Sequence, residues 1–199
     1  RRNGGADHGY PFTETRRFTI SPPGRVPLEP RTFSLADVPD LTLLADLRPE
    51  ARSIWMGVAP VPAPLHRLLR WLARGVRMRL VPPFRPFAPL LHWAANTLRW
   101  GEHRVGMFVE IAGPTASGRV VRRSWHMVAE GDSGPLIPSM AIEAIVRNML
   151  RGRMPAPGAR AATNELTLDD YAESFARHAI VSGVRDSSDD TDSPLFQRI

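Results

Sequence analysis

Two runs of alternating residues in the second half of the chain constrain its fold more than any other feature. In the first run, apolar side chains occupy every second position, at Val105, Met107, Val109 and Ile111. After a loop over residues 113–118, the segment from Val121 to Ala129 alternates in the same way. A period of two places successive side chains on opposite faces of a strand. The two runs therefore predict a long antiparallel hairpin.

The segments on either side of this hairpin have the period of helices. From Leu65 to Leu80, leucine and valine fall on one face, and the other face carries Arg67, Arg70, Arg74 and Arg77. A second helix is predicted over about residues 87–100. After the hairpin, Pro138 suits the first turn of a helix, for which we predict a buried stripe of Ile142, Ile145, Val146 and Met149. The run Thr167 to Asp170 predicts a capping box at the start of a last helix.

Weaker strand signals complete the expected fold. They lie at residues 31–37, 53–58 and 180–184, each bounded by proline, glycine or polar residues. Because strands and helices occur in clusters and do not alternate strictly, we predict an α+β domain whose largely antiparallel or mixed sheet is covered by helices.

Composition divides the chain into three parts. Residues 1–24 lack a period and are predicted to be an arm or a linker from a preceding domain, so we expect further sequence before Arg1. Residues 25–185 form the predicted α+β domain. Residues 186–199 are acidic and rich in serine, which is typical of a disordered tail.

The basic and thiol side chains exclude several kinds of chemistry. The chain has no cysteine, and all 26 of its basic residues are arginine. These two facts remove disulfides, thiolate nucleophiles, Schiff bases and a phosphate-loop lysine. A cytoplasmic location fits the lack of cysteine, and no apolar run approaches the roughly 20 residues of a membrane span. The net charge of +6 comes without a nucleic-acid recognition motif, so we expect no nucleic-acid partner.

Familiar catalytic motifs are incomplete. The run from Glu130 to Pro135 is close to the sequence around the nucleophile of chymotrypsin-like proteases, but one glycine is missing and a helix follows. A tight turn between strand and helix is the favoured interpretation. No G-x-G-x-x-G occurs, so no dinucleotide-binding fold is predicted in this chain. The histidines lack the paired spacing of a zinc site, so no metal is expected.

The segment from Ser124 to Ala141 resembles the C-terminal portion of saccharopine dehydrogenase-like oxidoreductases. In those proteins a strand ends in an acidic-Gly-Pro turn and leads through an Ile-Pro pair into an alanine-rich helix. Residues 157–160 and 166–170 are similar to the continuation of that block. The resemblance follows the order of elements over about residues 31–184, with specific motifs over about 100–171.

This resemblance implies a protein of two parts. An N-terminal Rossmann domain, absent from this chain, would hold NAD(P), and this chain would be the C-terminal α+β domain that covers the substrate and often forms a homodimer contact. The expected partners are therefore that domain, a second copy and a small-molecule substrate. We place the candidate substrate site at the turn after the hairpin, with candidate residues Trp125, His126, Asp132, Ser133 and Ser139.

The arginine-faced helix supports an alternative function. A basic face, an apolar face and nearby tryptophans are typical of helices that lie in a membrane interface. The chain would then be a non-catalytic module that binds an anionic membrane surface or an acidic partner through Arg67, Arg70, Arg74 and Arg77. The simpler interpretation is a helix packed on its own sheet with its arginines in water.

Overall fold

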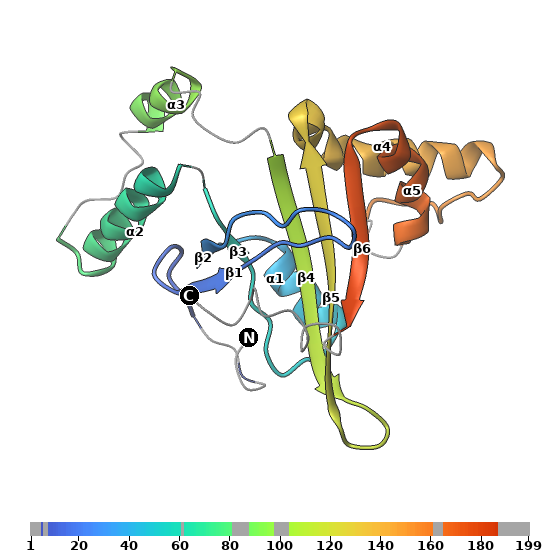
Figure 1. The fold of residues 1–199 in the computed structure, drawn as a ribbon, viewed down its shortest axis with the longest axis horizontal. Helices are drawn as coiled ribbons and strands as arrows, with labels where there is room; N and C mark the ends of the chain where they lie inside the picture. Colours follow the sequence, from blue (N-terminus) through green and yellow to red (C-terminus); the bar gives the residue numbers. More distant parts are fainter. Residues whose placement is uncertain are drawn as a thin grey trace. The chain divides into compact units, whose positions relative to one another are not determined.

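The chain forms two compact units. The computed structural model describes residue 5 and residues 8–60, 62–80, 88–97, 104–160 and 165–186. Unit 1 consists of residues 1–19 and 30–102, and unit 2 consists of residues 20–29 and 103–199. Each unit has a three-stranded antiparallel sheet accompanied by helices (Figure 1), which confirms the predicted α+β class and antiparallel pairing. The prediction of one sheet is wrong, because the strands form two separate sheets.

The sheet of unit 1 is small. Strand β1 (Thr15–Phe18) pairs with β2 (Arg31–Leu35), and β2 also pairs with β3 (Gly57–Val58). Strand β2 confirms the strand signal at residues 31–37. The run 53–58 forms a strand only at its last two residues, and β1 lies in the segment 1–24, for which we predicted no strand.

Three helices belong to unit 1. They are α1 (Asp40–Leu47), α2 (Ala63–Arg77) and α3 (Ala88–Thr97). Helix α2 confirms the periodicity found from Leu65 onward, and Pro64 lies in its first turn, where a missing N–H costs no hydrogen bond. The ends of the second predicted helix, residues 87 and 98–100, lie outside the described residues.

Unit 2 is built on the predicted hairpin, which is confirmed. Strand β4 (Arg104–Pro114) pairs with β5 (Val120–Glu130) over its whole length, and β6 (Ile180–Asp186) pairs with the other edge of β5. Figure 1 shows that the tip of the hairpin extends beyond β6. The predicted tail begins at the last residue of β6, and its residues 187–199 lie outside the described residues.

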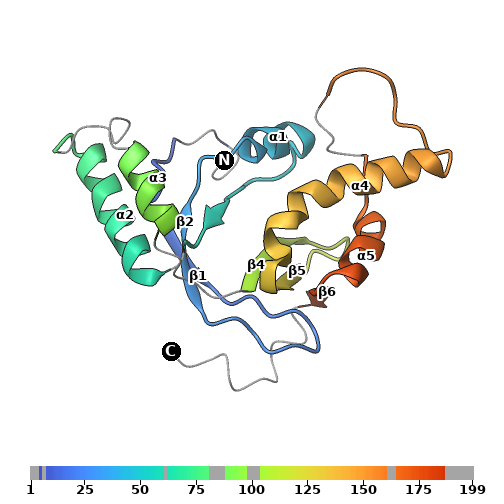
Figure 2. The ribbon, with the colours of Figure 1, turned by 90° about the horizontal axis from the view of Figure 1, so that it is seen from above.

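One turn and two helices follow β5 and cover one face of this sheet. The 3₁₀ turn η2 (Gly131–Leu136) leads into α4 (Ile137–Leu150), and α5 (Leu168–Arg177) precedes β6. Seen from above, α4 and α5 lie over the same end of the sheet (Figure 2). The core beneath them consists of Met127, Ala129, Met140, Phe175 and Ile180. Alternation along β5 explains why its odd-numbered residues supply this core.

The predicted buried stripe of α4 is wrong. Met140 is 2% exposed and Ile142 is 67% exposed, and the buried positions of the helix are Met140, Ala144 and Asn148. These residues are spaced by four and share one face. The helix buries the polar Asn148 because its side chain is hydrogen-bonded: Nδ2 donates to Asp170, and Oδ1 accepts from Arg153. Hydropathy alone cannot identify such a position.

A polar network joins α4 to α5. Glu143 on α4 accepts hydrogen bonds from Ser174 (3.0 Å) and from Arg147 and Arg177. At the start of α5, the predicted capping box is confirmed, with Asp170 accepting bonds from the N–H and the hydroxyl of Thr167. The two helices are thus held together by ion pairs at their rims and by apolar packing at their centre.

The other face of the unit 2 sheet is covered by residues 20–29, which we call the strap. A hydrogen bond joins the two ends of the strap: the N–H of Leu28 donates to the carbonyl oxygen of Ile20, with 2.8 Å between N and O. A side chain added at Gly106 would collide with Leu28 and Ile20, and one added at Gly183 would meet Pro23. Glycine at these two strand positions therefore allows the strap to lie close to the sheet.

Candidate functional site

The residues proposed for the substrate site do not converge on one cavity. Trp125 and His126 are neighbours on β5 and point to opposite faces of the sheet. Trp125 packs against the core beneath α4 and α5, whereas His126 lies under the strap. Ser139 donates its hydroxyl to the carbonyl of Leu136 at 2.7 Å, and Ser133 is half-buried. The side chain of Asp132 lies outside the described residues.

His126 has a fixed position and tautomer. Its Nδ1 accepts a hydrogen bond from the N–H of Ser21 at 3.2 Å, and its Nε2 lies 2.9 Å from Oγ of Ser124. Because a backbone N–H can only donate, Nδ1 must be unprotonated, and the ring proton is therefore assigned to Nε2. The ring also stacks on Phe108, with 5.8 Å between centroids. The imidazole thus anchors the strap, and its Nδ1 lone pair is occupied.

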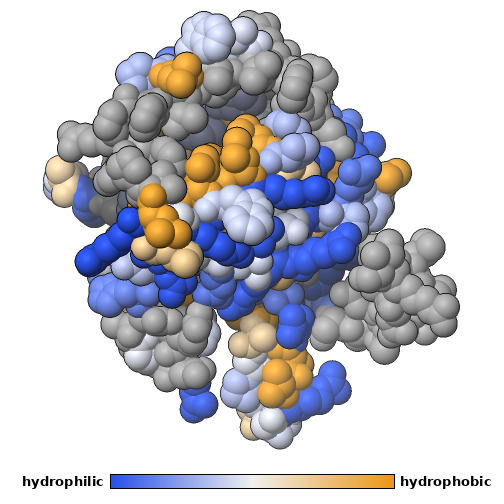
Figure 3. Space-filling view, turned by 90° about the vertical axis from the view of Figure 1, so that its left-hand side faces the viewer, coloured by the Kyte–Doolittle hydropathy of each residue, from blue (hydrophilic) through white to orange (hydrophobic). Residues whose placement is uncertain are grey.

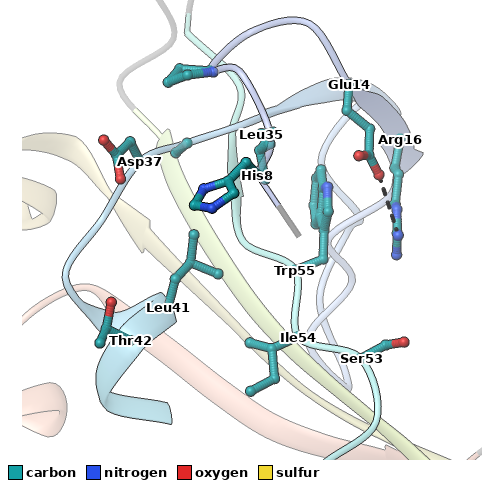
Figure 4. Close-up of a pocket in the computed structure, with 13 residues that line it drawn as sticks. His8, Glu14, Arg16, Leu35, Asp37, Leu41, Thr42, Ser53, Ile54 and Trp55 are labelled. Carbon is teal, nitrogen blue, oxygen red and sulfur yellow. Dashed lines mark hydrogen bonds and ion pairs between the residues drawn. The ribbon is translucent and has the colours of Figure 1, made fainter. Parts of the chain in front are cut away.

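A cavity lies elsewhere, in unit 1. It has a volume of about 370 Å³ and is lined by three segments that are distant in sequence, residues 8–16, 35–42 and 53–55. Figure 4 shows the imidazole of His8 lying between Asp37 on one side and the indole of Trp55 on the other, with Leu41 below it. Residues 35–42 connect β2, which ends at Leu35, to α1, which begins at Asp40. The other two segments meet them because β2 pairs with β1, next to residues 8–16, and with β3, next to residues 53–55.

The lining of this cavity combines charge with an apolar wall. Glu14 and Arg16 form an ion pair at 3.5 Å, and the guanidinium of Arg16 lies 4.8 Å from the ring centroid of Trp55. Asp37 supplies a second carboxylate, and hydroxyls come from Thr42 and Ser53. The apolar wall consists of Leu35, Leu41, Ile54 and Trp55. Such a mixture suits a small molecule that has both an apolar part and hydrogen-bonding groups.

Sequence reasoning missed every residue that lines this cavity. The three segments have no common motif, and they meet only because β1, β2 and the start of α1 fold together. A run of polar residues near Glu14 and an isolated tryptophan at position 55 are too common to predict a site.

Helix α2 has a mixed surface. Leu65, Leu68 and Trp71 are exposed, Trp71 to 72%, and Arg67 and Arg77 are exposed beside them. We call these five residues the α2 surface. Figure 3 shows apolar and hydrophilic side chains next to one another on the side of unit 1 that carries α2.

The expectation that the leucine face of α2 packs inward holds only in part. Leu69, Leu72 and Val76 are half-buried, and the fully buried residue of the helix is His66. Two of the four predicted arginines, Arg70 and Arg74, are themselves half-buried. The buried face of α2 is therefore shifted around the helix from the predicted leucine face toward His66 and Arg70. Part of the apolar face is consequently exposed to solvent.

The stretch of sequence that contains α2 carries charge of one sign. From Ala51 to Gly101 the sequence contains eight arginines and no aspartate or glutamate. Among the described residues, no helix has both the length and the apolarity to span a bilayer. The same part of the chain holds no group of three or more histidine, cysteine, aspartate or glutamate residues placed to bind a metal ion.

Comparison of the chain with models of protein families, with curated proteins and with solved structures finds no match in any of the three.

Proposed function

We propose that the chain is the substrate-side and dimerisation domain of an NAD(P)-dependent oxidoreductase similar to saccharopine dehydrogenase. In this proposal a Rossmann domain in another part of the same protein binds the nicotinamide cofactor. The observation that carries the proposal is the segment from Ser124 to Ala141. Its resemblance to that family extends over one continuous unit, in which β5 leads through η2 into α4.

The structure offers one feature that suits a substrate-side role. The cavity of unit 1 has the volume of a small-molecule site and an unsymmetrical lining, with carboxylates and an imidazole opposite an aromatic wall. Asp37, His8 and Thr42 would bind polar groups of the substrate, and Trp55 would pack against its apolar part. Residues Trp125 and His126 would then support the domain and not touch the substrate.

The experiment that tests this proposal uses the complete product of the reading frame together with the present chain. We expect the complete protein to bind NADPH or NADH and the present chain to bind neither, as measured by quenching of cofactor fluorescence. In a turnover assay of the complete protein, Asp37→Asn should raise KM for the organic substrate. Asp46→Asn, on the exposed side of α1, is the matched control. A complete protein that binds no dinucleotide would overturn the proposal.

The α2 surface favours a second candidate function, the binding of an anionic membrane. Exposed leucines and a tryptophan would enter the interface, and Arg67 and Arg77 would meet lipid phosphates. Each arginine near an anionic surface contributes about 1 kcal/mol of binding free energy. This role is compatible with the first, because it uses a different part of unit 1 from the cavity.

Vesicle sedimentation tests the second candidate. We expect the chain to sediment with vesicles that contain phosphatidylserine, and to do so less at high salt. Vesicles of phosphatidylcholine alone should not retain it. Arg67→Gln with Arg77→Gln, and separately Trp71→Ser, should abolish sedimentation. Arg119→Gln, in the hairpin loop of unit 2, removes a positive charge elsewhere and should have little effect. Equal loss in that control would mean that only net charge matters.

A further inference from the structure

Strand β4 is a long edge strand. It has 11 residues, and β5 pairs with one of its edges. Among the described residues, no strand pairs with its other edge. A long edge strand leaves a row of backbone N–H and C=O groups open to pairing, and proteins usually protect such edges with proline, bulges or inward-pointing charge. In β4 the single proline is the last residue, Pro114.

One face of β4 is also apolar and exposed. We call four of its residues the β4 stripe: Val105, Met107, Val109 and Ile111. They lie on the same face of the sheet as the core residues of β5 and β6 that α4 and α5 cover. All four are exposed, and Met107 is 48% exposed although its partner in β5, Met127, is 1% exposed. Helices α4 and α5 therefore bury the β5 part of this face. The turn η2 packs beside Val105 at the start of β4, where a Cβ at Gly134 would lie 2.6 Å from Val105 Cγ2. All four side chains of the β4 stripe nevertheless remain exposed, which is typical of a surface that binds a partner.

We propose that β4 pairs antiparallel with β4 of a second copy of this chain, with Met107 on the two-fold axis. In this register Val105 of one copy lies opposite Val109 of the other, so the β4 stripes of the two copies meet. On the opposite face of the sheet, Arg104 of one copy lies opposite Glu110 of the other. The inference names the contact for the dimerisation role proposed above and rests on that role.

Charge selects this register. Within one copy, Glu110 pairs with Arg122 at 2.8 Å, and Arg104 lies 3.7 Å from Glu130. Pairing about Met107 places the Arg104–Glu130 pair of one copy next to the Glu110–Arg122 pair of the other. Negative and positive charges then alternate across the four central strands of the six-stranded sheet. Opposite charges directly across two strands stabilise the pairing.

Neighbouring registers lack this match. Pairing about Phe108 would place Arg104 opposite Ala112 and Glu110 opposite Gly106. Pairing about Val109 would place Arg104 opposite Pro114. Neither brings opposite charges together, although both would pair more residues.

Cysteine cross-linking tests the register, because the chain has no cysteine of its own. Residues directly opposite in antiparallel strands have Cα atoms about 4.5–5.5 Å apart, which a disulfide can bridge. We expect Met107→Cys to form a covalent dimer under mild oxidation. Val105→Cys or Val109→Cys alone should stay unlinked, and a mixture of the two should link. Ile142→Cys, an exposed position on α4, reports chance collisions.

Light scattering on the unmodified chain provides the second measurement. We expect the mass of a dimer, and we expect Met107→Arg to raise the dimer dissociation constant at least about tenfold, because two arginines would meet on the axis. Circular dichroism checks that this exposed substitution leaves the fold intact.

The possible failures are distinguishable. A dimer whose Met107→Cys variant does not link, or whose Phe108→Cys or Val109→Cys variant links in its place, would overturn the proposed contact and leave the dimerisation role standing. A monomer would overturn both the contact and the dimerisation role. Neither result would bear on dinucleotide binding by the complete protein.

Discussion

Oγ of Ser34 lies 2.7 Å from Nε2 of His66, and this buried hydrogen bond joins β2 to α2. The ring of Phe12 meets the same imidazole edge-on, with 6.0 Å between centroids. Ser34→Ala would leave a buried imidazole nitrogen without its partner. We expect the free energy of unfolding of unit 1 to fall by about 1–3 kcal/mol, measured by urea unfolding. Thr32→Ala, on the same face of β2 and only half-buried, should cost less.

The same histidine should make unit 1 sensitive to acid. Burial, and secondarily the charge of Arg70, lowers the pKa of His66 from its ordinary value of 6.5. As the pH falls below 6.5, the unfolded chain binds a proton at this residue that the folded chain does not, so stability declines with falling pH. His66→Gln should remove this part of the dependence. An unchanged slope in that variant would show that other groups cause it.

Asp170 should contribute to the response of unit 2 to stronger acid. Hydrogen bonds from the N–H of Thr167, the amide of Asn148 and the hydroxyl of Thr167 lower the pKa of Asp170 from 3.8 to about 2. Its stabilising effect is complete above pH 3.8 and is lost as the pH falls towards 2. Asp170→Asn should lower the thermal midpoint by several degrees at neutral pH and flatten its dependence on pH in this window. Asp169→Asn, its exposed neighbour, should do neither.

Two substitutions in α4 test which face of the helix is buried. Met140→Ala would open a cavity in the core beneath the helix and should cost about 2–5 kcal/mol of unfolding free energy. Ile142→Ala removes a mostly exposed side chain and should change stability by less than about 0.5 kcal/mol. Denaturant unfolding of both variants gives the comparison. A larger loss of stability in Ile142→Ala than in Met140→Ala would show that the buried face is the one predicted from hydropathy.

Gly106 and Gly113 occupy the same strand in different surroundings. A Cβ at Gly106 would lie 2.5 Å from Leu28 Cδ1 and 2.8 Å from Ile20 Cδ1, whereas a Cβ at Gly113 would meet nothing within 4 Å. We expect Gly106→Ala to displace the strap, to cost about 1–3 kcal/mol and to speed hydrogen exchange at the N–H of Leu28. Gly113→Ala should leave both stability and exchange nearly unchanged. Equal effects would mean that the strap does not pack on this face.

The candidate site residues show what a local sequence pattern leaves open. The sequence places His126 and Trp125 a few residues before the turn that leads into α4, which makes both of them candidates for a site at that turn. In the folded chain, alternation along β5 sends them to opposite faces, and the strap occupies the Nδ1 lone pair of His126. The cavity, in contrast, is formed by His8, Asp37 and Trp55, which no local pattern connects.

Local patterns in the sequence predicted the β4–β5 hairpin, the helical character of α2 and α4, and the capping box of α5. Each follows from a local pattern, either the period of a strand or helix or the residues of a cap, so the sequence is enough to specify it. The folded chain, in contrast, fixes which helix face is buried, which residues line the cavity, and that the β4 stripe stays exposed. These features depend on long-range contacts such as Asn148 with Asp170 and Ser21 with His126, in which a hydrogen bond makes the burial of a polar group favourable despite its hydropathy.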